Sequence, residues 1–448
     1  MKSNKNISAD AAFFGSESIG KILLKIAPPV MLAQLIQALY NIVDSFFVGK
    51  YSDDSLTALT VIYPLQLIII AVSVGTGVGV NTYMARKYAL GNDDEAKKTA
   101  GAGMFLEIVS WAVFALISFF IMRPYVMTSA TSVGAINDAV TYGNIVCIGS
   151  LGTFLEANWS KVHQSSGNMR LPMLAQVAGA VTNIILDPIM IFGLGPVPEM
   201  GVAGAAYATV CGQFVAAIIT GIRGFHLPPK MSEIGTYIKN IYFYGYSSIF
   251  MQAMYTVYIF ALNVILAGFS DAAVTVLGLY YKTQSFFFIP LFGLQTCIVP
   301  VISFNYARKS YSRVREITKQ SLIISVGFMI FGIIAFLFFP DAMIHLFSNN
   351  DEVLRLGKIA FPIIGTSFIP AAFSLMMPVF FQAIGDGKTS VLLSILRQIV
   401  CLIPIFWAFS LIGVNYTWIS FPASEIVSGA AGMLLYARYV KKWKKEEL

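Results

Sequence analysis

The stretch QLIQALYNIVDSFFVG, residues 34–49, lies inside a long apolar segment but carries Gln34, Gln37, Asn41 and Asp44. Steps of three, four and three residues place these polar side chains on one face of a helix. A carboxylate near the middle of a bilayer costs about 2.5–3.5 kcal/mol on insertion scales, and such residues usually face a bundle interior or a water-filled path. The pattern therefore predicts a membrane helix with a functional polar face.

The composition is that of an integral membrane protein. Of the 448 residues, 57% are hydrophobic and only 12% are charged, whereas a soluble domain has about 25% charged residues. The first twenty residues are polar and hold no apolar core of the kind found in signal peptides, so we expect no cleaved signal peptide. The four cysteines lie apart in apolar runs and the three histidines are scattered, which argues against disulfides and against a metal enzyme.

Apolar runs long enough to span a bilayer, each of about 17–25 residues or more, recur along the whole chain. We expect twelve spans, at residues 26–49, 57–83, 99–122, 138–162, 171–195, 203–222, 240–267, 274–302, 317–339, 356–382, 389–411 and 416–437. Most of the 30 Lys and Arg residues fall at the termini or in the connections on one side of these spans. The positive-inside rule then predicts that both termini are cytoplasmic, and it accounts for most of the net charge of +7.

The two halves of the chain repeat polar residues and glycines at an offset of 218. The aligned pairs are Gln34 with Gln252, Ser52 with Ser270, Tyr63 with Tyr281, Gln66 with Gln284, Gly75 with Gly293, and Gly167 with Gly385. Each half holds six expected spans, so both halves have the same orientation and their symmetry axis lies along the membrane normal, with a transport site between them. The sequence thus predicts an all-α membrane protein of two six-helix bundles: an N-lobe at 1–222, a cytoplasmic linker at 223–240, and a C-lobe at 241–448.

Three motifs together resemble one known family. They are LYNIVDSFFVG in the first span, NIILDP in the fifth and GVAGAAYAT at the start of the sixth. In this order and repeat frame, the chain resembles the multidrug and toxic compound extrusion (MATE) family and is most similar to its DinF-like and MepA-like bacterial branch. The resemblance covers residues 18–438 and implies two helical bundles that export drugs or toxic compounds in exchange for Na⁺ or H⁺.

The resemblance also implies roles for particular residues. The N-lobe cation site of the family corresponds here to Asp44, Asn183, Asp187 and Thr209, and the proline that bends its first helix corresponds to Pro29. Some relatives carry further carboxylates in the seventh and tenth helices. Those two spans contain no Asp or Glu here. We therefore do not expect the C-lobe Na⁺ site, and we expect the cation site in the N-lobe.

The depth of these residues supports one shared pocket without reference to the family. Asp44, Asp187 and Thr209 all lie about 9–12 Å below the outer surface when each residue contributes 1.5 Å, and Asn183 and Asp187 are four residues apart on one helix face. Carboxylate, amide and hydroxyl oxygens suit Na⁺ and equally a shared proton, so the sequence leaves the coupling ion open. Structural roles also stay open: Asp44 as a cap of a bent helix, Asp187 at a break before Pro188, and the other two as contacts between helices.

Further polar residues are candidates for ion coupling or substrate contact. Gln37 and Asn41 share the face of Asp44, and the remaining candidates are Gln34, Tyr63, Gln66, Gln252, Tyr281, Gln284 and Glu425. Glu425 has either a functional role or a packed hydrogen bond, and we expect the intramembrane cations Arg397 and Lys282 to pair with an oxygen or to extend to the interface. The run of Gly75, Gly77 and Gly79 lies within a span, where it favours close helix packing or a hinge over a phosphate loop.

We therefore predict a secondary active multidrug efflux antiporter, not an enzyme, in a bacterial inner membrane. Its expected partners are small amphipathic, often cationic compounds and membrane lipids, without nucleic acid, and we expect a monomer. The sequence has no Walker motif, so we expect no cofactor and only H⁺ or Na⁺ as the coupling ion. The alternatives are a flippase for lipid-linked precursors from the same superfamily and, more distantly, a passive channel.

Overall fold

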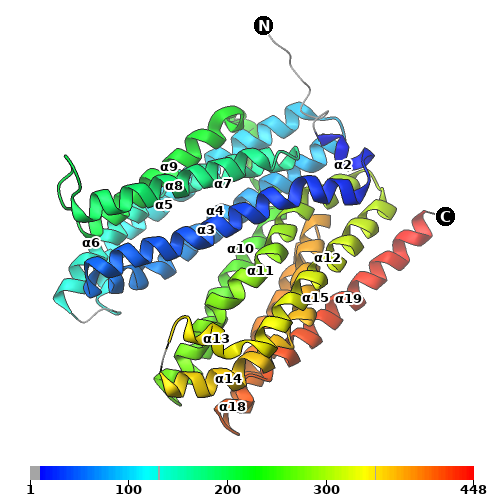
Figure 1. Ribbon diagram of the computed structural model, residues 1–448. Coiled ribbons are helices and arrows are strands. Elements are labelled where there is room, and N and C mark those ends of the chain that lie inside the picture. The colour runs from blue at the N-terminus through cyan, green and yellow to red at the C-terminus, as the bar shows by residue number, and fades with distance from the viewer. Residues whose placement is uncertain (1–10, 130–131, 349, 448) are drawn as a thin grey trace. The chain divides into compact units, whose positions relative to one another are not determined.

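The protein is built almost wholly of long helices (Figure 1). A computed structural model describes residues 11–129, 132–348 and 350–447, and within these ranges there is no strand. Ten of the described helices are long and apolar enough to cross a membrane, and a pair bent by 56°, α14 (Asp351–Gly365) and α15 (Phe368–Ile384), makes an eleventh candidate. The chain forms two compact units, of which unit 1 holds residues 25–249 and those before 17, and unit 2 holds 17–24 and the residues from 250 onward.

Unit 1 packs its long helices side by side. Their bounds are α2 (Phe13–Ser16), α3 (Ile19–Tyr51), α4 (Asp53–Ala89), α5 (Asp93–Val126), α6 (Val133–Gly149), α7 (Leu151–Ser165), α8 (Arg170–Phe192), α9 (Val202–Gly224) and the first part of α10 (Met231–Ala267). The fourth expected span, 138–162, is broken between Gly149 and Ser150 into α6 and α7, each shorter than a full span. Helix α10 begins inside the expected linker, so that only residues 225–230 join it to α9.

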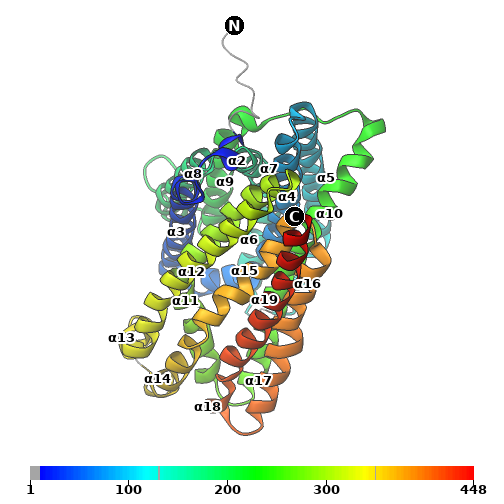
Figure 2. The same ribbon diagram turned by 90° about the vertical axis from the view of Figure 1, so that its right-hand side faces the viewer.

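Unit 2 contains the rest of α10 and the helices that follow it. They are α11 (Asp271–Ala307), α12 (Tyr311–Phe338), α13 (Pro340–His345), α14, α15, α16 (Gly387–Ile395), the π-helix η1 (Leu396–Leu402), α17 (Ile403–Ser410), α18 (Val414–Thr417) and α19 (Ser420–Glu446). In Figure 2, α16 and α17 form one column beside α19, and η1 is the segment that joins them. Stacked and edge-on rings of Phe288, Phe336, Phe361 and Phe368 fill the centre of this unit.

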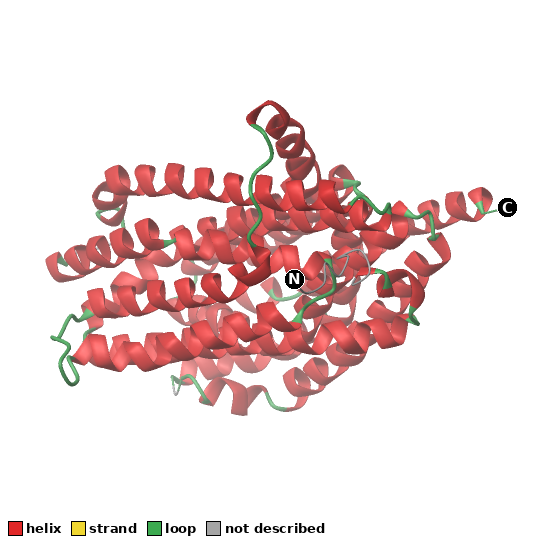
Figure 3. Ribbon diagram, turned by 90° about the horizontal axis from the view of Figure 1, so that it is seen from above, coloured by secondary structure: helices red, strands yellow, loops and turns green. Residues whose placement is uncertain are grey.

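The sequence repeat reappears as repeated helix ends. Ser52 begins α4 by accepting a hydrogen bond from the amide of Asp54, and its repeat partner Ser270 begins α11 by accepting one from Ala273. At the other end of the repeat, Gly167 follows α7 with φ +86° and Gly385 follows α15 with φ +88°. Only glycine adopts this left-handed conformation without strain, so the same turn closes corresponding helices in both halves. Short loops join the helix ends in Figure 3.

The glycine run of α4 packs closely against neighbouring helices, as expected. A Cβ atom on Gly79 would lie 2.1 Å from the carbonyl oxygen of Ile241, and one on Gly75 would lie 2.9 Å from the backbone nitrogen of Ile249, both in α10. A Cβ on Gly77 would lie 2.9 Å from Cγ of Lys161 in α7. These glycines therefore allow the backbone of α10 to approach α4 within unit 1, and the prediction of close helix packing is confirmed.

We expect Gly79→Ala to destabilise the protein by about 1–3 kcal/mol, because the added methyl group overlaps backbone that cannot move aside easily. The measurement is the thermal unfolding midpoint in detergent. Gly278→Ala is the matched control, since a Cβ at Gly278 meets no atom within 4 Å. Equal unfolding midpoints for the two variants would contradict the close approach of α10 to α4.

Candidate carboxylate site

Two buried carboxyl groups meet inside unit 1, one on α3 and one on α8. Asp44 is 8% exposed and Asp187 is 0% exposed, and their carboxyl groups lie within hydrogen-bonding reach of each other. Oδ1 of Asp44 and Oδ2 of Asp187 have no hydrogen-bond partner in the protein. Two ionised carboxylates this close repel each other, and a shared proton or a bound cation relieves that repulsion. A role of this pair in binding a coupling ion stays a prediction.

An amide and a hydroxyl complete the surroundings of Asp187. Nδ2 of Asn183, one turn earlier on α8, donates to Oδ1 of Asp187 at 3.2 Å and to Oγ1 of Thr209 on α9 at 3.4 Å. Thr209 comes within reach because α8 and α9 approach closely: a Cβ on Gly212 would lie 2.6 Å from the carbonyl oxygen of Gly179. Small residues at the helix crossing therefore position the polar side chains.

The structure brings two tyrosines to this site that the sequence analysis did not select. Tyr40 lies one turn before Asp44 on α3 and is close enough to interact with both carboxyl groups. Tyr142 on α6 is within hydrogen-bonding reach of Thr209 and of Gln66 on α4. The only signal for Tyr40 was its spacing of four residues from Asp44, and Tyr142 had no signal beyond its place in an apolar run.

The other predicted residues of unit 1 lie at different degrees of burial. Gln34 and Gln37 are half-buried on α3, and Asn41 is exposed. The polar residues of this helix face therefore do not all lie in the buried site of Asp44. Gln66 joins the site through Tyr142. Tyr63 is 55% exposed and interacts with Tyr40. Gln66 and Tyr63, both on α4, therefore lie at the edge of the carboxylate site.

The predicted hinge lies within an unbroken helix. Pro29 and the preceding Pro28 both stand inside α3, which runs without interruption from Ile19 to Tyr51. The hinge role of Pro29 stays a prediction. Both prolines lie a few residues after the point at which α3 passes from unit 2 to unit 1, between Leu24 and Lys25.

One predicted residue of unit 2, Tyr281, belongs to a cluster of tyrosines. The ring of Tyr281 contacts those of Tyr255, Tyr258 and Tyr280 at centroid distances of 6.2, 6.3 and 4.9 Å. Gln252 and Gln284 are half-buried, and Nε2 of Gln252 has no hydrogen-bond partner. Tyr281, Gln252 and Gln284 all belong to unit 2, and a role of these three residues in substrate contact stays a prediction.

Glu425 forms the most extensive charged contact of unit 2. Nε of Arg397 donates to its two carboxylate oxygens at 2.9 and 3.0 Å, Nη2 of Arg397 donates at 2.6 Å, and Oγ of Ser374 also donates to it. Arg397 lies in the π-helix η1, a local widening that often occurs at functional positions. The expected pairing of Arg397 is confirmed, and Lys282 is exposed. The contacts show the packed hydrogen bonds of Glu425, whereas its role in coupling stays a prediction.

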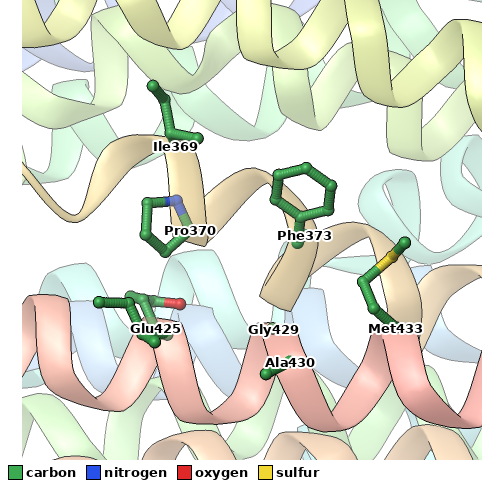
Figure 4. A pocket seen from close by; sticks show the side chains of 8 residues that line it. Ile369, Pro370, Phe373, Glu425, Gly429, Ala430 and Met433 are labelled. Atoms are coloured by element: carbon green, nitrogen blue, oxygen red, sulfur yellow. The ribbon is translucent and has the colours of Figure 1, made fainter.

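A cavity of about 310 Å³ lies beside this ion pair. It is lined by α15 and α19, through Ile369, Pro370, Phe373, Glu425, Ile426, Gly429, Ala430 and Met433. In Figure 4, Glu425 lies at one end of the cavity, below Pro370, and Met433 lies at the other. Its walls are apolar, because the carboxylate oxygens of Glu425 are turned to Arg397 and Ser374.

The donors around Asp44 fit either predicted coupling ion. No group of three or more His, Cys, Asp and Glu residues is placed to hold a metal ion in the described part of the chain. However, Asp44, Asn183 and Asp187 each present one oxygen without a hydrogen-bond partner, and such hard oxygens suit Na⁺. A proton needs only the two carboxyl groups.

The chain has two repeated helical units, and one of them holds a buried pair of carboxyl groups. These features are typical of multi-pass membrane transporters built from two helical bundles. The MatE family model matches this chain twice, over residues 29–189 and again over 247–407. The two matches are displaced by 218 residues, the offset found in the sequence. The chain belongs to the MatE family.

Curated relatives match over nearly their full length. The chain is 25% identical to a protein named FAD transporter from Shewanella oneidensis, covering 94% of this chain and 95% of that protein. It is 26% identical to the probable multidrug resistance protein NorM of Thermotoga maritima, covering 95% and 94%. The multidrug export protein MepA of Staphylococcus saprophyticus is 21% identical, covering 94% of each chain. This chain is accordingly a membrane transporter, and the MepA-like branch is consistent with its sequence.

Solved structures share the fold. An outward-facing MATE transporter of the MOP superfamily superposes with a TM-score of 0.90 at 21% identity, covering 99% of this chain and 100% of the other. A MOP superfamily transporter from Pyrococcus furiosus, described as having a binding pocket of reverse polarity, gives a TM-score of 0.89 with the same identity and coverage. These likenesses confirm the predicted two-bundle fold class.

Proposed function

We propose that this transporter is an antiporter that exports amphipathic, often cationic compounds in exchange for H⁺ or Na⁺. It would act in a bacterial inner membrane with both termini in the cytoplasm. The observation that carries the proposal is the buried pair of Asp44 and Asp187, each with one oxygen that has no hydrogen-bond partner. These oxygens would receive the coupling ion. Two of the relatives named above are multidrug proteins, which supports the class of substrate.

The coupling follows from the charge of the pair. An ion that binds between Asp44 and Asp187 removes their negative charge, and this drives transport only when it binds one conformation more tightly than the other. Helix α3 carries Asp44 and has residues in both units, so a change of charge at Asp44 acts on a helix common to the two. Pro29 is the position at which we expect this helix to bend.

The experiment that tests this function is dye efflux from proteoliposomes. A fluorescent cationic dye is loaded, and a pH gradient or a Na⁺ gradient is imposed separately. Efflux driven by one gradient supports antiport and identifies the ion. Dye movement that is indifferent to both gradients would refute antiport and favour a passive channel or a flippase.

A second class of substrate comes from a relative. Because the Shewanella oneidensis protein is named an FAD transporter, FAD is tested as the alternative cargo in the same vesicles. Efflux of FAD without efflux of the dye would replace the cationic substrate class and leave the ion-coupling proposal to be decided by the gradients.

A further inference from the structure

A third carboxyl group of unit 1 is buried away from the carboxyl pair. Glu107 lies on α5 and is the only acidic residue of the expected span 99–122. It is 0% exposed, and neither Oε1 nor Oε2 has a hydrogen-bond partner in the protein. A carboxyl group without any partner, at full burial, calls for an explanation other than packing.

Neighbouring helices place further unpartnered oxygens within about one turn of Glu107. A Cβ on Gly103 of α5 would lie 2.4 Å from Oδ1 of Asn158 on α7 and 2.5 Å from Cγ2 of Val80 on α4. Consecutive helices α4 and α5 are antiparallel, so one turn onward along α5, at Glu107, corresponds to one turn back along α4, at Thr76. Oγ1 of Thr76 and Oδ1 of Asn158 are also buried without partners. Glu107 is therefore at about the level of Thr76 of α4 and one turn from Asn158 of α7, and we call these three buried residues the polar layer.

Glu107 has no counter-charge in the described part of the chain. The titratable side chains described on the helices packed against α5 are Asp54, Tyr63, Tyr83, Arg86, Lys87 and Tyr88 on α4, Asp138, Tyr142 and Cys147 on α6, and Glu156, Lys161 and His163 on α7. On α10, Glu233 and Tyr237 contact Lys98 and Glu95 near the start of α5, about two turns or more from Glu107. Lys161, the buried cation among them, donates to Oε1 of Gln164 at 2.9 Å. Glu156 accepts from Ser160 and Asp138 from Ser55. None of the described ion pairs includes Glu107.

This environment selects a proton as the ligand. An ionised carboxylate buried without a counter-charge is strongly disfavoured, so the group is stable here in its neutral, protonated form. Na⁺ is a poorer ligand than a proton because the site offers a single carboxyl group, whereas the pair at Asp44 offers two. A conformation that exposes Glu107 to water would let it release that proton.

The layer around Glu107 is separate from the carboxyl pair. Gln66 of α4 is linked through Tyr142 to the level of Asp44, and Thr76 lies ten residues further along the same helix. At 1.5 Å per residue the two levels are about 15 Å apart. Thr76 is displaced toward the end of α4 that carries Arg86 and Lys87, the end predicted to be cytoplasmic.

We propose that Glu107 is a second proton-binding carboxyl group, which holds a proton in the conformation described here and releases it in another conformation of the transport cycle. This extends the proposed function, since it adds a site on the cytoplasmic side of the Asp44 and Asp187 pair. It requires that the two conformations bind this proton with different affinity.

The test is infrared difference spectroscopy of the full-length protein in lipid, with and without a cationic dye. A protonated carboxyl group has a carbonyl band that disappears on ionisation. We expect the dye to change a component of this band that is retained in Asp44→Asn and lost in Glu107→Gln. Glu316→Gln, at an acidic residue bonded to Gln320 on α12, is the control and should keep the change. A spectrum that is the same in wild type and Glu107→Gln overturns the proposal.

Dye efflux separates this result from that of the proposed function. If protons drive efflux, Glu107→Gln should retain dye exchange without a gradient and lose about 5–150-fold in the pH-driven rate, the usual range of coupling between sites. An unchanged pH-driven rate overturns the role of Glu107 and leaves antiport intact. If wild-type efflux depends on neither gradient, antiport is refuted. The infrared measurement still decides whether Glu107 binds and releases a proton. If Glu107→Gln does not fold, Glu107→Asp should shift the band, and an unshifted band overturns the assignment.

Discussion

Asp44→Asn is expected to abolish gradient-driven export and to leave the fold intact. The amide has nearly the shape of the carboxyl group and still hydrogen-bonds with Asp187, so we expect a stability change of about 1 kcal/mol or less. However, it carries no negative charge and takes up no proton, so only Asp187 stays ionisable and the two side chains can no longer share one cation. Export by the purified variant in proteoliposomes should fall to the level of protein-free vesicles.

The control for Asp44→Asn is a carboxylate of the same kind on the surface. Asp341→Asn removes a carboxylate that pairs with Lys358 at 3.1 Å, where both side chains are about half-exposed, and it should export like wild type. Monodisperse elution of both variants in detergent establishes that they fold. Undiminished export by Asp44→Asn at equal protein content would eliminate the carboxyl pair as the coupling site.

Arg397→Met is expected to destabilise unit 2 by about 3–5 kcal/mol, the usual cost of leaving one member of a buried ion pair without its partner. Glu425 would remain buried at 5% exposure with Ser374 as its only donor. The double variant Arg397→Met with Glu425→Leu should recover most of this loss, because it removes both charges and keeps side-chain volume. The thermal unfolding midpoint measures all three proteins.

The exposed ion pair of Lys358 and Asp341 is the reference for the stability lost when an ion pair is broken. Lys358→Met breaks the pair with Asp341 in water and should cost about 1 kcal/mol or less. If Arg397→Met were as stable as Lys358→Met, or if the double variant were no more stable than the single one, the ion pair would not act as a buried charge pair. A functional role of Glu425 would show instead as lost efflux in a double variant of wild-type stability.

The fold could be predicted from the sequence because the bilayer restricts it to long apolar helices. The repeated Ser52 and Ser270, and the repeated Gly167 and Gly385, are aligned in the sequence, and the structure places them at corresponding helix ends in both halves. The break between α6 and α7 could not be predicted, because Gly149 and Ser150 are flanked by residues apolar enough to continue a span. Breaks of this kind depend on packing against other helices.

The candidate site was predictable where polar residues stand out from apolar surroundings. Asp44, Asn183, Asp187 and Thr209 were selected in this way, and the structure brings them together, although their roles stay predictions. Tyr142 was missed because tyrosine is common here and its orientation depends on α6 packing. The sequence did not identify the partner of Arg397, because Glu425 lies 28 residues further along the chain on another helix.

Glu107 is a second lone carboxylate within an apolar span. A lone carboxylate inside a span is a candidate functional site by default, and Glu107 meets this condition as well as Asp44 does. Only Ser110 and Trp111 lie within one turn of Glu107 on the same helix face, so α5 has no polar stripe like that of residues 34–44. Thr76 and Asn158, which lie within about one turn of Glu107, come from other helices and are brought near it only by the fold.

The division of α10 between the two units has a consequence for how the halves of this protein can be separated. The sequence repeat suggests two modules that were once independent, and residues 225–230 are the obvious place to cut. Yet the first part of α10, which belongs to the second repeat, covers Gly75 and Gly79 in unit 1. A fragment ending at residue 228 would expose that surface to lipid. Because residues 231–249 belong to unit 1, a cut at residues 225–230 divides that unit, and we expect transport only when both fragments are co-expressed, not from either one alone.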